Sequence, residues 1–161
     1  MRKSVFLELV LLLLLLSACN YYDTEEIQYI TASKVKSKIN SENNIAGLEY
    51  NWTYNPEESI LPYCNIINRT DIDYITGYGT IEVYVDGEWM MAKSLKNGHI
   101  PEIAFFIPAN STSDRITAYL GCYGNSFYPG KYRIVLKIQE DKDEFQQSKG
   151  VYYAVKEFVV E

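Results

Sequence analysis

The side chains best able to do chemistry in this chain are its three cysteines and its single histidine. A Ser-His-Asp or Cys-His site would need His99 as its base. His99 follows Gly98 and precedes Pro101 by two residues, in a segment with loop composition, and no nucleophile–base set is visible around it. Gly-rich phosphate loops and paired-cysteine motifs do not occur either. The sequence therefore predicts no catalytic site, no cofactor and a protein that is not an enzyme.

Two Asp-x-Asp pairs raise the question of a metal site. Asp71 and Asp73 form one pair, and Asp141 and Asp143 form the other. Calcium binds oxygen-rich loops of this kind. Neither pair comes with the third ligand and the glycine of a known calcium loop. Solvated loop carboxylates are the favoured interpretation, and no metal site is expected.

Cys19 ends an N-terminal segment that is typical of exported proteins. Arg2 and Lys3 precede an apolar run at residues 9–16, and two small residues separate this run from Cys19. The run is well short of the ~20 apolar residues that span a bilayer. A secretory signal peptide is therefore expected rather than a transmembrane helix.

The segment Leu16-Ser17-Ala18-Cys19 resembles the lipobox of bacterial lipoproteins at all four positions. The resemblance implies that the Cys19 thiol receives a diacylglyceryl group, with acyl chains such as palmitate, and that the chain is cut just before it. Residues 1–18 are then a lipoprotein signal peptide. The mature protein is expected to be exported and lipid-anchored to a bacterial membrane, either the cell membrane or the outer membrane. An ordinary signal peptide with a chance cysteine is the alternative, and Glu8 departs from the pattern.

The charge of the chain limits its partners. The whole sequence has a formal net charge of -6, and loss of Arg2, Lys3 and Glu8 with the signal peptide leaves -7. A nucleic-acid partner is not expected, because binding to phosphates needs a basic face. An acidic surface is also not drawn to anionic lipids by charge. Attachment to the membrane therefore depends on the lipid of Cys19.

Composition divides the mature chain into a tether and a domain. Residues 19–46 are expected to be a lipidated flexible tether, because Val35 and Ile39 are the only large apolar residues between Ser33 and Asn44. From residue 47 the pattern changes to short alternating strands, which predicts an all-β domain over residues 47–161. The expected strands cover residues 48–54, 60–68, 79–85, 88–93, 103–107, 115–122, 131–139 and 151–160. The apolar residues of the last strand switch from one face to the other between Val155 and Phe158, which predicts a β-bulge near residues 156–157.

Residues 128–134 place Tyr132 at the start of a strand, just after a glycine turn, which resembles the tyrosine corner of immunoglobulin-like sandwiches. The order of further motifs resembles the bacterial immunoglobulin-like domains of secreted and lipid-anchored proteins: Tyr54-Asn55-Pro56, Glu82, Asp86-Gly87-Glu88-Trp89 and Glu157-Phe158-Val159-Val160. The resemblance covers about residues 47–161. It implies a single immunoglobulin-like β-sandwich of about 7–8 antiparallel strands.

Cys64 and Cys122 fall on the inward faces of the second and sixth expected strands, which the resemblance makes antiparallel neighbours. Antibody-type domains carry a cysteine two residues after the corner tyrosine, where this chain has Ile134, so the usual disulfide between the sheets is absent. A bridge between Cys64 and Cys122 fits an exported chain if their register places them opposite each other. Two buried free thiols are the equal alternative.

A two-residue turn at Asp86-Gly87 predicts a hairpin that pairs Tyr84 with Trp89 on the outer face of its sheet. An aromatic pair there could stack on a glycan or anchor a protein partner. Cross-strand pairing that only stabilises the hairpin is the other interpretation, and the favoured one.

Glu82 and Arg133 are expected to form an ion pair, since the third and seventh strands are neighbours in the assumed topology. Both point away from the core, because the residues flanking each one point into it. As an exposed pair it would contribute only ~0.2 to 1 kcal/mol.

The function indicated by these features is a non-catalytic interaction module at the cell envelope. Its partners are the membrane, through Cys19, and an unidentified protein or glycan. The alternative is a protease inhibitor that presents sandwich loops, with residues 69–77 and 140–150 as the loops concerned.

Overall fold

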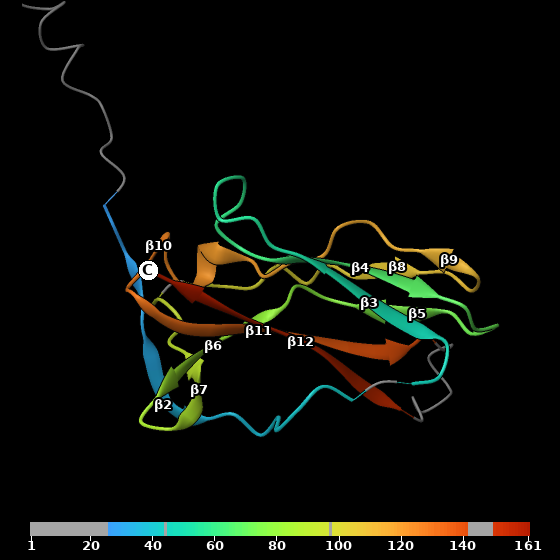
Figure 1. Ribbon diagram of the computed structural model, residues 1–161, viewed down its shortest axis with the longest axis horizontal. Helices are drawn as coiled ribbons and strands as arrows, with labels where there is room; N and C mark the ends of the chain where they lie inside the picture. The colour runs from blue at the N-terminus through green and yellow to red at the C-terminus, as the bar shows by residue number, and fades with distance from the viewer. Residues whose placement is uncertain (1–25, 44, 97, 142–149) are drawn as a thin grey trace, which may run out of the picture.

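The computed structural model describes residues 26–43, 45–96, 98–141 and 150–161 (Figure 1). These residues form twelve strands and a single 3-10 turn at Leu120–Cys122. The expected all-β class is confirmed, and within the described ranges no helix is long and apolar enough to cross a membrane. The strands are β1 Tyr29–Ile30, β2 Ala32–Lys36, β3 Leu48–Thr53, β4 Tyr63–Asn68, β5 Tyr74–Thr76, β6 Thr80–Val85, β7 Glu88–Ala92, β8 Phe105–Ile107, β9 Ser111–Thr112, β10 Ser126–Phe127, β11 Gly130–Glu140 and β12 Val151–Val160.

The larger sheet is built around β11, which pairs along its length with β12 and on its other side with β6 and then β5. Strands β7 and β2 extend this sheet beyond β6, and β8 extends it beyond β5. The four apolar residues that alternate along β11 are all buried and form the inner face: Tyr132, Ile134, Leu136 and Ile138. Alternation of apolar and polar residues along β11 is therefore what sets the core.

Strands β5 and β6 act as one bent strand against β11. Thr76 pairs with Ile138 and Thr80 pairs with Val135, so β5–β6 has one residue more than β11 over the same length. Gly79 sits at this bulge, where a Cβ atom would lie 2.6 Å from the Ile134 side chain. A side chain is excluded there, which is a common reason for glycine inside a strand.

Two expectations about the strands are wrong. The register of β11 with β12 is continuous from Val151 to Val160, so β12 has no bulge near residues 156–157. Apolar residues change from one face of β12 to the other along the sequence because outward positions such as Val155 are also apolar. Val155 pairs with Val135 of β11. The expected strand at 115–122 is reduced to single bridges at Ile116 and Ala118 before the 3-10 turn.

The second sheet contains β3, β4 and β9, and its inner residues pack on those of β11. The segment around Ile116 connects the two sheets, which explains why it forms no regular strand. Ile116 exchanges backbone hydrogen bonds with Cys64 of β4, whereas the neighbouring Thr117 accepts a hydrogen bond from Gly79 beside β6. Consecutive residues thus pair with opposite sheets.

The predicted tyrosine corner is present. The Tyr132 hydroxyl donates a hydrogen bond of 2.9 Å to the Tyr128 carbonyl oxygen, and Tyr132 is buried. Its ring packs edge-on to Phe127 and stacks with Phe158, at centroid distances of 4.8 and 5.8 Å. The corner thus fastens the chain before β11 to both β11 and β12.

Residues 26–43, hereafter the strap, are ordered, and the expectation of a flexible tether is wrong for them. In Figure 1 the strap runs down one end of the domain and then along one side of it. β1 pairs parallel to β10, β2 pairs antiparallel to β7, and Asn43 bridges to Tyr153 of β12. The composition of the strap did not indicate that it is ordered. It is held mainly by backbone hydrogen bonds, and Ile30 is its single fully buried apolar side chain.

Candidate functional site

The β6–β7 hairpin positions the predicted aromatic pair. Asp86 and Gly87 have φ values of 51° and 87°, the left-handed geometry that this two-residue turn requires. Tyr84 pairs with Trp89 in the expected register, and their ring centroids are 5.0 Å apart. The Tyr84 residue is 41% exposed, so the pair presents aromatic surface to solvent.

Two cations from β11 lie against these rings. Lys131 Nζ is 5.2 Å from the Tyr84 ring centroid and 5.4 Å from that of Trp89, and it forms an ion pair of 2.6 Å with Glu157. Arg133 lies over Trp89 at 4.4 Å. We call Tyr84, Trp89 and Lys131 the aromatic–cation face. Lys131 was not singled out from the sequence, although it lies two residues before Arg133 and therefore projects from the same face of β11.

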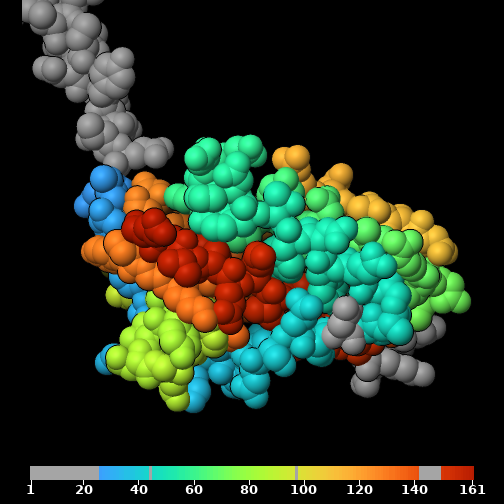
Figure 2. All heavy atoms as spheres, in the orientation of Figure 1, coloured from blue at the N-terminus to red at the C-terminus, as the bar shows by residue number. Residues whose placement is uncertain are grey.

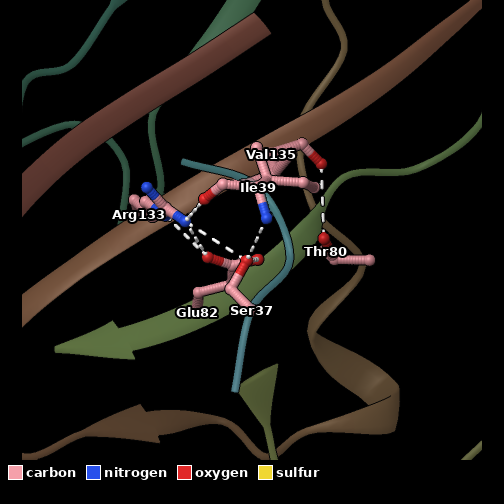
Figure 3. A network of polar contacts seen from close by, with 6 residues as sticks. All are labelled: Ser37, Ile39, Thr80, Glu82, Arg133 and Val135. Atoms are coloured by element: carbon pink, nitrogen blue, oxygen red, sulfur yellow. Dashed lines mark hydrogen bonds and ion pairs between the residues drawn. The ribbon is translucent and has the colours of Figure 1, made fainter. Parts of the chain in front are cut away.

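Arg133 and Glu82 form the expected ion pair, but the pair is buried rather than exposed (Figure 3). The two residues are direct partners between β11 and β6, and Arg133 donates through Nε to Glu82 Oε2 at 2.6 Å. Both side chains are only 2% exposed. They project from the outer face as predicted, and the strap covers them there.

The strap also completes the hydrogen bonding of the pair. The Ser37 hydroxyl donates to Glu82 Oε1 at 2.6 Å, and Arg133 donates to the Ile39 carbonyl oxygen at 2.6 Å (Figure 3). The carboxylate and the guanidinium thus have partners besides each other, as buried charges require. Neither Ser37 nor Ile39 carries a sequence signal for this role, since both lie in a polar segment far along the chain from β11.

A groove of about 490 Å³ lies beside the covered pair, between the strap and the outer face of the sheet. Its walls are largely apolar, and Lys137 is among its polar residues; the apolar and aromatic lining includes Val35, Ile39, Tyr78, Met91, Val135 and Tyr153. The outer face of the larger sheet is therefore only partly covered by the strap.

Cys64 and Cys122 are both buried and both free. Cys64 lies opposite Ile116, and Cys122 lies in the 3-10 turn six residues further on, so the facing register needed for a disulfide is not formed. Burial, together with the charge of Glu42, raises the pKa of the Cys64 thiol to about 12. Burial also raises the pKa of Cys122. Both thiols are held in the neutral, unreactive form.

The acidic pairs form no metal site in the part of the chain described. Among those residues, no group of three or more His, Cys, Asp or Glu side chains could hold a metal ion. Asp73 instead accepts a hydrogen bond of 2.7 Å from the Ala109 amide. Asp143 and the lipobox with Cys19 lie outside the described residues.

The suspected inhibitor loop at 69–77 is structured. It contains β5, and its start is held by Asn68, a buried residue that sequence reasoning did not single out. The Asn68 amide donates to the carbonyl oxygens of Ile72, Ile107 and Pro108, and its own oxygen accepts from Thr70. Most of the other suspected loop, residues 142–149, lies outside the described residues.

Comparison with known proteins agrees with this architecture. A family model described as Bacterial Ig-like domain matches residues 47–157. The matched range contains the aromatic–cation face and the buried ion pair, whereas the strap precedes it. Searches of curated proteins and of solved structures return no significant match.

Proposed function

The chain belongs to the bacterial Ig-like domain family, and we propose that it is a membrane-anchored lipoprotein whose domain is a non-catalytic interaction module at the cell envelope. The family supports an interaction module more than an enzyme, because sandwiches of this type present surfaces on a rigid core. The lipobox pattern at residues 16–19 supports anchoring through a lipid on Cys19.

The observation that carries the interaction role is the exposed aromatic–cation face. Tyr84 combines a large ring with a polar hydroxyl and sits on a rigid hairpin, so little side-chain entropy is lost on binding. Lys131 beside it supplies an ammonium group that is 43% exposed and pairs with Glu157, so its remaining donors can meet a partner. A protein loop or a glycan that stacks on Tyr84 while offering an acceptor to Lys131 is the partner that this face fits.

Binding is tested on the full chain with Cys19→Ser, so that the strap is kept and the lipid is absent. We expect Tyr84→Ser to weaken binding to the envelope partner by about 30-fold, corresponding to the loss of a hot spot of about 2 kcal/mol. Tyr63→Ser is the matched control, because Arg115 lies over the Tyr63 ring at 4.5 Å in a second aromatic–cation contact. Equal binding by the two variants would contradict the assignment of the face.

Anchoring is tested separately by labelling cells with a radioactive or clickable fatty acid. The unchanged chain should carry label and sediment with membranes. Cys19→Ser should abolish the label, and the protein should either become soluble or stay unprocessed. Label that survives in Cys19→Ser would contradict lipidation at this residue.

A further inference from the structure

The chain leaves the domain at a fixed place, where residues 26–28 cross the segment that precedes β10. The Gln28 amide donates to Asn125 Oδ1 at 2.9 Å, and the Gln28 carbonyl oxygen accepts from the Asn125 and Ser126 amides at 2.9 and 3.2 Å. Gly124 makes this crossing possible, because its φ is +137° and a Cβ atom there would lie 2.3 Å from the Gln28 oxygen. The point from which the N-terminal part of the chain departs is therefore part of the folded domain.

Apolar and aromatic side chains are exposed around this point. Ile27 is 62% exposed, and the rings of Tyr29 and Tyr128 stack at a centroid distance of 4.1 Å while remaining 42% and 51% exposed. Figure 2 shows residues 26–30 in blue beside the orange atoms of β10 at one end of the molecule. We call Ile27, Tyr29 and Tyr128 the exit surface.

We propose that the exit surface rests in the interfacial layer of the lipid bilayer and so orients the domain on the membrane. The inference depends on the proposed lipid on Cys19. Seven peptide units separate Cys19 from Glu26, and a chain of that length spans at most about 25 Å. The hydrogen bonds of Gln28 fix the start of this connection at the exit surface, so this end of the domain stays within about 25 Å of the anchored residue.

The side chains of the exit surface are of the kinds that favour the interfacial layer of a lipid bilayer. Tyrosine side chains favour the membrane–water interface because their rings are apolar and their hydroxyls stay hydrated. Ile27 adds apolar area that can enter the acyl boundary. Glu26 lies at the same place and the whole chain is acidic, which favours zwitterionic over anionic headgroups.

The test uses the full acylated chain in phosphatidylcholine vesicles whose acyl chains carry bromine near the headgroup, which quenches nearby tryptophan emission. Tyr128→Trp reports on the exit surface. Ile72→Trp is the matched control, because Ile72 is also an exposed apolar residue (37%) but lies in the β4–β5 loop at the opposite end of the domain (Figure 1). The unsubstituted chain supplies the background from Trp52 and Trp89. We expect Tyr128→Trp to be quenched at least about twofold more than Ile72→Trp.

A longer connection separates binding from mere proximity. A flexible Gly/Ser insertion of about 20 residues before Glu26 lets the domain turn freely. Quenching of Tyr128→Trp should persist with the insertion if the exit surface itself binds lipid.

Quenching that falls to the level of Ile72→Trp, with or without the insertion, overturns the inference. Mass spectrometry of the N-terminal peptide distinguishes this failure from that of the proposed function. An acylated Cys19 without preferential quenching leaves the anchor intact and removes only the membrane contact, whereas an unacylated Cys19 removes both.

Discussion

Removal of the guanidinium from the buried ion pair should be one of the most damaging single changes in this domain. In Arg133→Met the Glu82 carboxylate would stay 2% exposed with the Ser37 hydroxyl as its remaining partner. The Ile39 carbonyl oxygen would lose its donor at the same time. Breaking a buried pair in this way costs about 3–5 kcal/mol of unfolding free energy, compared with about 0.2–1 kcal/mol for an exposed pair.

The reverse change and the double change isolate the interaction itself. Glu82→Met should cost somewhat less, because Arg133 would keep the Ile39 carbonyl and its contact with Trp89. Glu82→Met/Arg133→Met removes both charges and should be more stable than the sum of the single losses predicts. We expect a coupling energy of at least about 2 kcal/mol between the two sites.

Urea unfolding of the full chain with Cys19→Ser, followed by far-ultraviolet circular dichroism, measures each free energy. Lys131 and Glu157 supply a matched control cycle, because they form an ion pair of 2.6 Å between β11 and β12 but are 43% and 48% exposed. Their coupling should stay below about 1 kcal/mol. A coupling for Glu82 and Arg133 no larger than that of the control would refute the reasoning, since it would mean that the strap does not exclude water from the pair.

Three further outcomes are expected. Tyr132→Phe should lower the unfolding free energy by about 1 kcal/mol in the same urea assay, because only its hydrogen bond to Tyr128 is lost; an unchanged midpoint would contradict this. Asn68→Ala should cost about 2–4 kcal/mol, because buried carbonyl oxygens lose their donors, and a loss under about 1 kcal/mol would show that water replaces the amide. The neutral Cys64 thiol, with its pKa raised to about 12, favours the folded state, and its contribution to stability is lost as the pH rises from about 9 through 12. Alkaline titration of Cys64→Ala should therefore show a shallower decline, and an identical slope would count against burial of this thiol.

Features set by local geometry could be predicted from the sequence. The turn at Asp86-Gly87 fixes the pairing of Tyr84 with Trp89, because a two-residue loop permits one register. The parity of β6 and β11 likewise places Glu82 and Arg133 on one face. Both predictions need only the period of a strand and the length of a turn.

Features set by distant chain segments could not be predicted. The burial of the ion pair depends on Ser37 and Ile39, which no apolar pattern marks and which lie more than 90 residues before Arg133. The sequence left open whether Cys64 and Cys122 are bridged, for a related reason. The alternation of residues along β4 gives the face on which Cys64 lies. The residue opposite it is Ile116, because the segment around Ile116 passes from one sheet to the other.

The strap also determines when the chain can finish folding. All strand partners of the strap are synthesised later: β7 at residues 88–92, β10 at 126–127 and Tyr153 in β12. No part of the strap can therefore reach its native pairing until most of the chain has left the ribosome. Contacts of such high sequence separation make folding slow. A chain built in this way stays unfolded for longer after synthesis, because β1 and β2 must wait for β10 and β7. Such a delay is compatible with the export that we propose for this chain.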